Sequence, residues 1–210
     1  MKKIFAIILA AVMALAALGC GGGSDKKSSS APAPQTKTSS GTTAKASAAP
    51  QSLAGKKVLV AYFSWSGNTR AVAERIASET NGEIFEIVPA TPYPSDYSET
   101  ADQAKQEQSE NARPAIAGDV ADFASYDVVM LGFPIWWYRE PMIIDTFLET
   151  HDFAGKTIVP FSTSGGSDIA DAVSYIRSMA GGATVLDGIN FTDRNNLDGL
   201  EDWLSASGLR

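Results

Sequence analysis

Apolar and polar positions alternate in blocks over residues 57–205. Short runs rich in β-branched and aromatic residues alternate with stretches whose apolar residues recur on a helical period. The predicted strands are 57–63, 83–88, 127–133, 156–162 and 184–190. The predicted helices are 69–79, 141–149, 168–179 and 196–205, with a further exposed helix inside 89–118. Strands that alternate with helices are typical of a parallel sheet with helices on both faces.

The character of the first strand supports a buried parallel sheet. Residues 57–63 read KVLVAYF, a nearly continuous apolar run that suits a strand covered on both faces. Right-handed crossovers then give an α/β fold, a doubly wound three-layer sandwich whose five parallel strands lie in the order 2-1-3-4-5. Ligands of such sheets bind at the carboxyl ends of the strands. The loops after the first, third and fourth strands are therefore the candidate site.

The N-terminal residues 1–20 have the outline of a signal peptide. Lys2 and Lys3 precede an apolar run over 4–18, which is shorter than the roughly 20 residues that a membrane-spanning helix needs. The run ends close to Cys20, the only cysteine of the chain. We therefore predict a removable export signal and not a permanent membrane span.

The residues around Cys20 resemble the lipobox of bacterial lipoproteins. In that family the cysteine thiol is diacylated and becomes the mature N-terminus, so the resemblance implies a lipid anchor at Cys20. Ala17 stands where the family usually has a larger aliphatic residue. A plain signal peptide with a chance cysteine is the alternative. Acyl chains would hold the protein on a membrane surface without spanning it.

Composition and charge divide the rest of the chain near residue 54. Residues 21–50 are almost wholly Gly, Ser, Ala, Pro, Thr and Lys, so we predict a disordered linker over 21–54 that reaches roughly 30 Å. The folded domain is predicted over 55–210. It holds 17 − 6 = 11 basic and 24 − 1 = 23 acidic residues, a net charge of −12. Such a domain repels nucleic acid and either attracts basic partners or is simply soluble.

Few side chains of the domain are suited to thiol, metal or hydrolytic chemistry. No cysteine follows Cys20, which excludes disulfides and thiolate sites from the domain. His151 is the only histidine. A metal site with several histidine ligands is therefore not possible, and Ser-His-Asp hydrolysis has only this one residue to use. We expect His151 to cap or flank a helix end, and we expect no metal site.

The loop after the first strand has the composition of an anion site. It reads SWSGNT over residues 64–69 and leads directly into a helix, whose N-terminus offers unpaired N–H groups and the positive end of the helix dipole. Gly67 lets the backbone close around an anion, and three hydroxyls can donate to it. The absence of lysine favours a phosphate monoester over a nucleoside triphosphate with magnesium. A serine-rich helix cap is the alternative.

The loops after the third and fourth strands complete the candidate site. The first of them contains three successive aromatic residues, Trp136, Trp137 and Tyr138, which are costly to leave in water and usually cover a ligand or partner. A hydrophobic plug against the next helix is the alternative for one of the tryptophans. The second loop holds Gly165 and Gly166, which allow a flat ligand to approach the backbone closely.

Together these loops resemble those of the flavodoxin-like family. Residues 64–69 are similar to its phosphate loop, 132–137 match the run GxPIWW, and 161–166 match FxTxGG. The resemblance implies FMN as cofactor, with the flavin as the reactive group and Trp136 or Trp137 stacked on it. The implied FMN-binding residues are Ser64, Trp65, Ser66, Gly67, Asn68 and Thr69, then Pro134, Ile135, Trp136, Trp137 and Tyr138, then Thr163, Ser164, Gly165 and Gly166.

Two departures from electron-carrier flavodoxins favour two-electron chemistry. The loop after the fourth strand has no tyrosine to cover the second flavin face, and Tyr138 follows Trp137 where carriers often have glycine. A non-glycine residue with positive φ costs roughly 1 kcal/mol or more.

Three functions remain open from the sequence. The leading one is an exported FMN protein, lipid-anchored at the outer face of the cytoplasmic membrane or in the cell envelope, that transfers electrons to or from a redox partner protein or a quinone. Anchoring would raise the effective concentration of a membrane partner. The alternatives are an FMN-dependent quinone reductase and a flavin-free binding or scaffold module.

Overall fold

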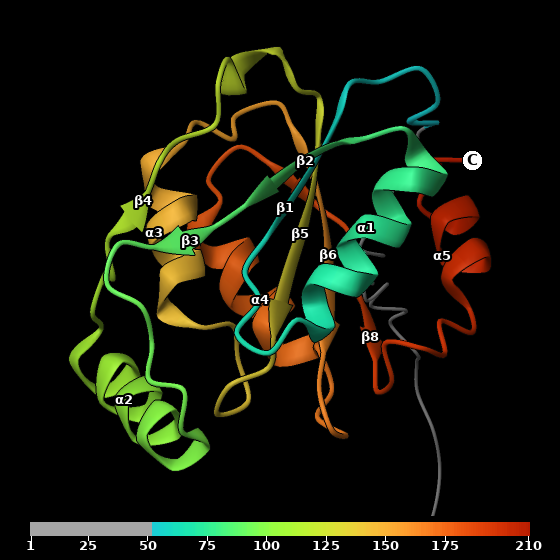
Figure 1. Ribbon diagram of the computed structural model, residues 1–210. Coiled ribbons are helices and arrows are strands. Elements are labelled where there is room, and N and C mark those ends of the chain that lie inside the picture. The colour runs from blue at the N-terminus through green and yellow to red at the C-terminus, as the bar shows by residue number, and fades with distance from the viewer. Residues whose placement is uncertain (1–51) are drawn as a thin grey trace, which may run out of the picture. The chain divides into compact units, whose positions relative to one another are not determined.

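A parallel β-sheet lies at the centre of the computed structural model, which describes residues 52–210 (Figure 1). The predicted signal peptide, Cys20 and nearly all of the predicted linker lie outside the described residues. The central strands are β1 (Val58–Tyr62), β5 (Val128–Pro134) and β6 (Thr157–Thr163), and β2 (Glu83–Glu86) forms one edge. All of these strands pair in parallel. The predicted strand order is confirmed.

The fifth predicted strand is interrupted in the structure. The opposite edge consists of β7 (Thr184–Val185) and β8 (Ile189–Phe191), which pair with the start and the end of β6. Pro160 lies between the two pairings and has no N–H group to donate to an edge strand. A Cβ on Gly188 would lie 2.9 Å from the carbonyl oxygen of Pro160. The backbone of the segment between β7 and β8 therefore lies close to the backbone of β6.

Helices cover both faces of the sheet, as the sequence predicts. Side chains of α1 (Asn68–Thr80) and α5 (Leu200–Ala206) pack on the face that carries Val58, Val60 and Tyr62. Side chains of α3 (Met142–Thr150) and α4 (Ala170–Met179) pack on the face of Leu59, Ala61 and Phe63. Both faces of β1 are therefore buried, which explains its continuous apolar sequence.

The long connection after β2 folds into a small accessory unit. Val88, predicted at the end of the second strand, belongs instead to β3 (Val88–Pro89), which pairs antiparallel with β4 (Ile116–Ala117). Between them lies the expected exposed helix, α2 (Tyr97–Glu110), followed after β4 by the short 3-10 helix η1 (Phe123–Ser125). In Figure 1, α2 lies at the end of the domain where β1, β5 and β6 terminate.

The ends of two helices test further sequence predictions. His151 is the C-cap residue of α3, as expected. The last helix begins at Leu200 and not at residue 196, because Gly199 has a left-handed backbone and residues 193–196 form a turn closed by a β-bridge. No helix within residues 52–210 has the length and apolarity needed to cross a bilayer.

Candidate functional site

The loop between β1 and α1 leaves the start of the helix open. Gly67 is the N-cap residue with φ of 84°, and no side chain forms a capping hydrogen bond there. The Ser64 Oγ accepts a hydrogen bond from the Gly67 N–H at 3.1 Å, which closes the loop upon itself. The first N–H groups of an α-helix have no partner inside the helix. This end of α1 can therefore donate them to an anion.

The predicted phosphate hydroxyls occupy different positions in this loop. Ser66 is exposed, Ser64 is turned toward the Gly67 amide, and Thr69 is buried. The Oγ1 atoms of Thr69 and Thr163 lie 2.9 Å apart, so this hydroxyl also ties α1 to the end of β6. Ser66 is thus the hydroxyl most open to a ligand, while Ser64 and Thr69 shape the loop from behind.

The loop after β5 is a tight turn with an unusual backbone. Trp136 and Arg139 exchange two hydrogen bonds, at 2.9 Å from Trp136 N to Arg139 O and at 3.2 Å in the reverse direction. The two residues between them have positive φ, 49° at Trp137 and 71° at Tyr138. Two-residue turns with positive φ at both central positions favour Asn-Gly. A Trp-Tyr pair in this conformation is strained.

The two tryptophans of this turn have different surroundings. The ring of Trp136 packs edge-on against Phe63 at 5.4 Å and Tyr93 at 5.1 Å between ring centroids, so it packs against the hydrophobic core. The ring of Trp137 is 43% exposed. Its Nε1 donates to the carbonyl oxygen of Ala101 at 2.8 Å, and the Lys105 ammonium lies 4.9 Å from its centroid. Trp136 is the plug, and Trp137 is presented at the surface.

The three predicted loops border one cleft made of two adjoining hollows, of about 730 and 420 Å³. The larger hollow reaches Ser66 and Asn68 at the start of α1, and the smaller one reaches Trp137 and Tyr138. Both share six lining residues, which are Trp65, Tyr97, Ile135, Trp136, Ser164 and Gly165. The cleft therefore suits a long ligand with an anionic end at α1 and a flat end beside the turn.

The structure brings twelve of the predicted site residues to this cleft. They are Trp65, Ser66, Asn68, Pro134, Ile135, Trp136, Trp137, Tyr138, Thr163, Ser164, Gly165 and Gly166. Ser64, Gly67 and Thr69 do not line it. A Cβ added at Gly165 or Gly166 would meet no atom within 4 Å, so the cleft is open on this side.

Sequence reasoning missed lining residues from two other segments. Tyr97, the first residue of α2, is 75% exposed, and its ring lies 6.4 Å from that of Trp65. The end of β8 adds Phe191, and the loop after it adds Arg194. Only the folded chain brings these segments to the carboxyl edge of the sheet. The one sequence signal for Arg194 is a basic residue four positions after the last predicted strand.

Arg194 is a positive charge next to the start of α1. A Cβ built on Gly67 would lie 3.9 Å from its Nη1. The arginines within residues 52–210 that form ion pairs are Arg70, Arg75, Arg113, Arg139, Arg177 and Arg210, which leaves the guanidinium of Arg194 without a carboxylate partner in this part of the chain. It is available to an anion in the cleft.

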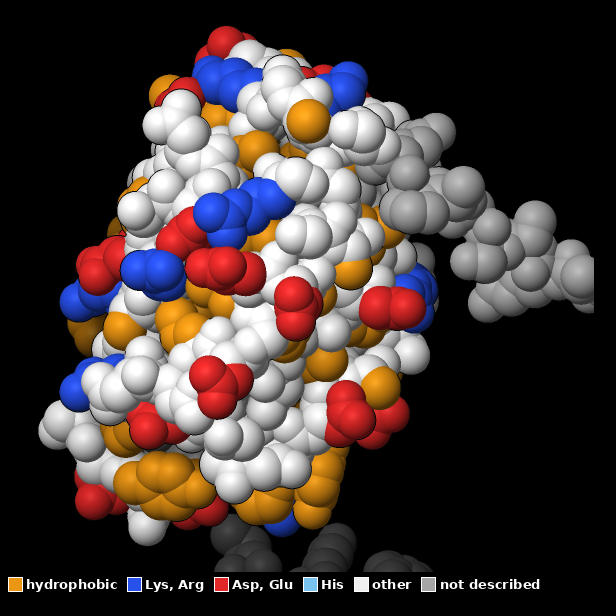
Figure 2. Space-filling view, turned by 90° about the vertical axis from the view of Figure 1, so that its right-hand side faces the viewer, with side chains coloured by type: hydrophobic (Ala, Val, Ile, Leu, Met, Phe, Trp, Pro, Cys, Tyr) orange, Lys and Arg blue, Asp and Glu red, His pale blue; other side chains and the backbone are white. Residues whose placement is uncertain are grey.

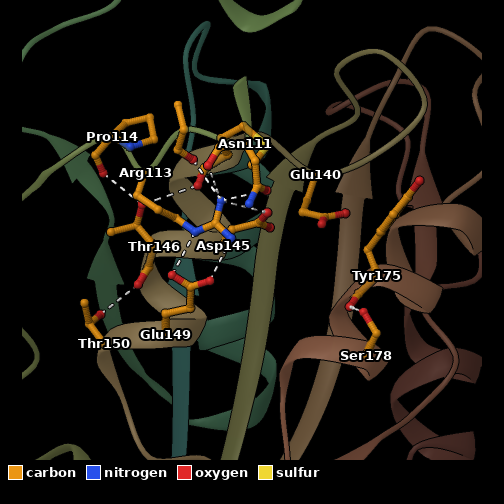
Figure 3. A network of polar contacts seen from close by, with 12 residues as sticks. Asn111, Arg113, Pro114, Glu140, Asp145, Thr146, Glu149, Thr150, Tyr175 and Ser178 are labelled. Atoms are coloured by element: carbon orange, nitrogen blue, oxygen red, sulfur yellow. Dashed lines mark hydrogen bonds and ion pairs between the residues drawn. The ribbon is translucent and has the colours of Figure 1, made fainter. Parts of the chain in front are cut away.

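A buried charge cluster lies directly behind the aromatic turn and was not predicted from the sequence. Arg139 Nη2 donates to Glu140 Oε1 and, at 2.8 Å, to Asp145 Oδ2. Both carboxyl groups are buried, which raises the pKa of Glu140 to about 8 and also raises the pKa of Asp145, while the Arg139 charge opposes both shifts. The pair therefore retains a proton at neutral pH. Figure 3 shows Glu140 and Asp145 with Arg113 nearby.

The family of the domain follows from its sequence as well as its geometry. Residues 57–207 match the model of a family described as flavodoxin. The chain belongs to the flavodoxin family. Its members share the doubly wound sheet with a cleft at the carboxyl ends of the strands, which is the architecture found here. No curated protein sequence matched the chain.

Solved flavodoxin-family structures are similar over nearly their whole length. A candidate flavoprotein from Bacteroides eggerthii is 35% identical, with a TM-score of 0.66, and the match covers 74% of this chain and 99% of that one. A candidate flavoprotein from Bacteroides uniformis is 38% identical, with a TM-score of 0.64, and the match covers 72% and 99%. A flavoprotein from Lactobacillus acidophilus, solved in complex with FMN, is 30% identical, with a TM-score of 0.60 and coverage of 70% and 98%.

Proposed function

We propose that this flavodoxin-family domain binds FMN in the cleft and transfers electrons through it. The proposal rests on the cleft, which has two chemically different ends. An uncapped helix N-terminus with Arg194 lies at one end, and the exposed Trp137–Tyr138 turn lies at the other. The complex of the Lactobacillus relative with FMN supports the choice of ligand.

The residues of the cleft fit the two parts of this cofactor. The backbone N–H groups at the start of α1, the Ser66 hydroxyl and the Arg194 guanidinium would hold the phosphate. Ser164, Gly165 and the aromatic turn would border the isoalloxazine ring. When bound, FMN supplies the reversible acceptance of one or two electrons that no side chain here provides. The protein binds the cofactor, orients it and adjusts its potential.

The N-terminal sequence supports a place for this chemistry outside the cytoplasm. In our proposal the chain is exported through its signal peptide and held at the membrane surface or in the cell envelope by acylated Cys20. A membrane-bound redox protein or a quinone is then the partner, because a nicotinamide donor is scarce there. The net charge of −12 over residues 55–210 repels nucleic acid and so argues against it as a partner.

The surface fits docking at the cleft end of the domain. Figure 2 shows the side that carries α1 and α5, on which acidic and basic side chains are interspersed and hydrophobic side chains are exposed at the lower edge. Figure 1 places the loops after β5 and β6 at that same end. Tyr97, Trp137 and Tyr138 are among the exposed large hydrophobic residues. A partner would approach the flavin across these aromatic side chains.

A second candidate function is two-electron reduction of a quinone. The open space beside Gly165 and Gly166, where an added Cβ would meet no atom within 4 Å, favours it. Rapid turnover of a soluble quinone with a nicotinamide or artificial donor would support this enzyme. Slow turnover, with fast exchange of electrons with a membrane protein, would support the carrier.

The cofactor assignment can be tested by titration of the flavin-free protein with FMN. We expect one FMN per chain with a dissociation constant below micromolar. Failure to bind FMN at micromolar concentration would reject the proposal in favour of the flavin-free module.

A further inference from the structure

The Trp137–Tyr138 turn borders the cleft in a conformation that its own sequence does not favour. Both residues have positive φ, and neither is glycine, asparagine or aspartate. Such residues persist in this region only where their surroundings hold them. The contacts of the turn therefore show what keeps it in place.

Helix α2 holds one side of the turn by two hydrogen bonds to or from neutral groups. The Trp137 Nε1 donates to Ala101 O, and the Gln108 Nε2 donates to Trp136 O, each at 2.8 Å. The Trp137 bond is exposed, and the Gln108 bond is only partly buried. Water competes for such bonds, so α2 alone is a weak restraint.

The other side of the turn is held by charged and buried groups, through Arg139. Its backbone N–H closes the turn on Trp136 O, and its guanidinium donates to Glu140 and Asp145. The ring of Tyr175, on α4, lies 4.0 Å from the guanidinium carbon. The Arg139 side chain is only 16% exposed, while Glu140 and Asp145 are fully buried. One side chain thus ties the turn to α3 and α4.

The charges around Arg139 make this attachment costly to break. Arg113 also faces Asp145, at 3.8 Å, and pairs with Glu149 at 2.7 Å. Burial raises the pKa of Glu140 to about 8 and also raises the pKa of Asp145, while the positive charge of Arg139 opposes both shifts. Removing the guanidinium would leave the buried Glu140 without an ion partner and Asp145 with Arg113 alone. Arg139 Nε, Glu140 Oε2 and Asp145 Oδ1 have no hydrogen-bond partner within the described residues, so Arg139 bonds both carboxyls through its Nη2 atom.

We propose that Arg139 is a positioning residue for the flavin: clamped by Glu140, Asp145 and Tyr175, it holds the Trp137–Tyr138 turn in the left-handed conformation that shapes the ring end of the cleft. The inference rests on the proposed binding of FMN. Arg139 itself does not line the cleft and acts through the turn.

The test compares Arg139→Lys with a matched control in the same cluster. Lysine keeps the charge but loses the planar guanidinium, whose Nη2 atom bonds both carboxyls and whose face stacks on the Tyr175 ring. We expect Arg139→Lys to weaken the binding of both FMN and riboflavin about tenfold, because the ring end of the cleft is altered. The control, Arg113→Lys, makes the same change at an arginine that does not touch the turn, and its affinities should stay within about twofold of wild type.

A second substitution separates positioning from a general structural role. Glycine adopts positive φ without strain, so adding Tyr138→Gly to Arg139→Lys should restore most of the lost riboflavin affinity. In the flavin-free protein, Arg139→Lys should also speed hydrogen exchange at the Arg139 amide, which closes the turn, and the double variant should slow it again. Tyr175→Leu, at a 46% exposed position, provides a milder version of the test, with about a threefold loss.

The outcomes distinguish this inference from the proposed function. Failure of the wild-type protein to bind either flavin would reject the proposed function. Flavin binding by the wild type with unchanged affinity in Arg139→Lys, or a loss that Tyr138→Gly does not restore, would overturn the positioning role alone. If Arg139→Lys does not fold, unchanged riboflavin affinity and amide exchange in Tyr175→Leu would overturn it.

Discussion

The hydroxyl groups of Thr69 and Thr163 meet in the interior of the domain, with their Oγ1 atoms 2.9 Å apart. Thr69 lies in the first turn of α1, and Thr163 ends β6. The contact joins two of the three loops that border the cleft. In our account it fixes the distance between the phosphate end and the ring end of the site, so that one ligand can reach both.

Thr69→Val should therefore affect both stability and binding. It removes the bond to Thr163 and leaves that hydroxyl unpaired, which should lower the free energy of unfolding of the flavin-free protein by about 1 to 2 kcal/mol. FMN affinity should fall as well. Urea unfolding and FMN titration measure the two effects. The control is Thr80→Val on the same helix, where the hydroxyl bonds only to Ile76 O. Equal FMN affinity in both variants would contradict a role in shaping the cleft.

Arg194→Gln should weaken binding of FMN but not of riboflavin. The guanidinium lies beside Gly67 and has no carboxylate partner in residues 52–210, so its charge is available to the phosphate. We expect FMN affinity to fall about tenfold, with less dependence on salt than in the wild type. The control is Arg177→Gln, which removes a surface pair with Asp187 away from the cleft. Equal losses of affinity for FMN and riboflavin would show that Arg194 does not act on the phosphate.

Glu140 should make the domain less stable as pH rises. Its pKa is raised from 4.5 to about 8 in the folded protein, so between these values the folded state binds more protons than the unfolded state. The free energy of unfolding should then fall with rising pH, by at most about 1.4 kcal/mol per pH unit from this group. The raised pKa of Asp145 acts in the same direction. The lowered pKa values of Asp127 and Glu149 act in more acidic solution, where stability is lost as pH falls.

Glu140→Gln should flatten this dependence. Urea unfolding at several pH values from 5 to 8.5 would measure it, with Glu149→Gln as the control on the neighbouring, solvent-exposed carboxylate. A wild-type stability that stays constant or increases over this range would show that Glu140 is ionised in the folded protein.

The proposed lipid anchor predicts a result for Cys20. Metabolic labelling with a radioactive fatty acid should label the wild-type protein and not Cys20→Ser, and the variant should leave the membrane fraction. Equal labelling would exclude this cysteine as the acylated residue. Flavin binding should be unchanged in Cys20→Ser, because the cysteine precedes the flavodoxin-family domain.

Much of the fold could be read from the sequence because its strands carry strong local signals. The continuous apolar run at 57–63 and the similar runs at 127–133 and 156–162 correspond to β1, β5 and β6 with small shifts at their ends. The split of the last strand depends on Pro160, a residue of another strand. Local periodicity cannot report such a long-range constraint, so the sequence predicted one strand where the structure has β7 and β8.

The candidate site was predictable where it consists of loops next to strands. The residues after β1, β5 and β6 meet at one edge because parallel strands end there. The conformation of Trp137 and Tyr138 was not predictable, since residues of these types rarely adopt positive φ without outside support. That support comes from Arg139, Asp145 and Tyr175, which only the tertiary structure brings together. Arg194 and Tyr97 were missed for the same reason.

The measurement that tests the account most directly is titration of the flavin-free protein with FMN and with riboflavin, followed by absorption and by intrinsic tryptophan fluorescence. Our account predicts that one FMN binds per chain, that riboflavin binds more weakly because it lacks the phosphate, and that tryptophan fluorescence is quenched as the ring settles beside the aromatic turn. Equal affinity for the two flavins would contradict the phosphate end of the site. Absence of any binding would contradict the flavin site as a whole.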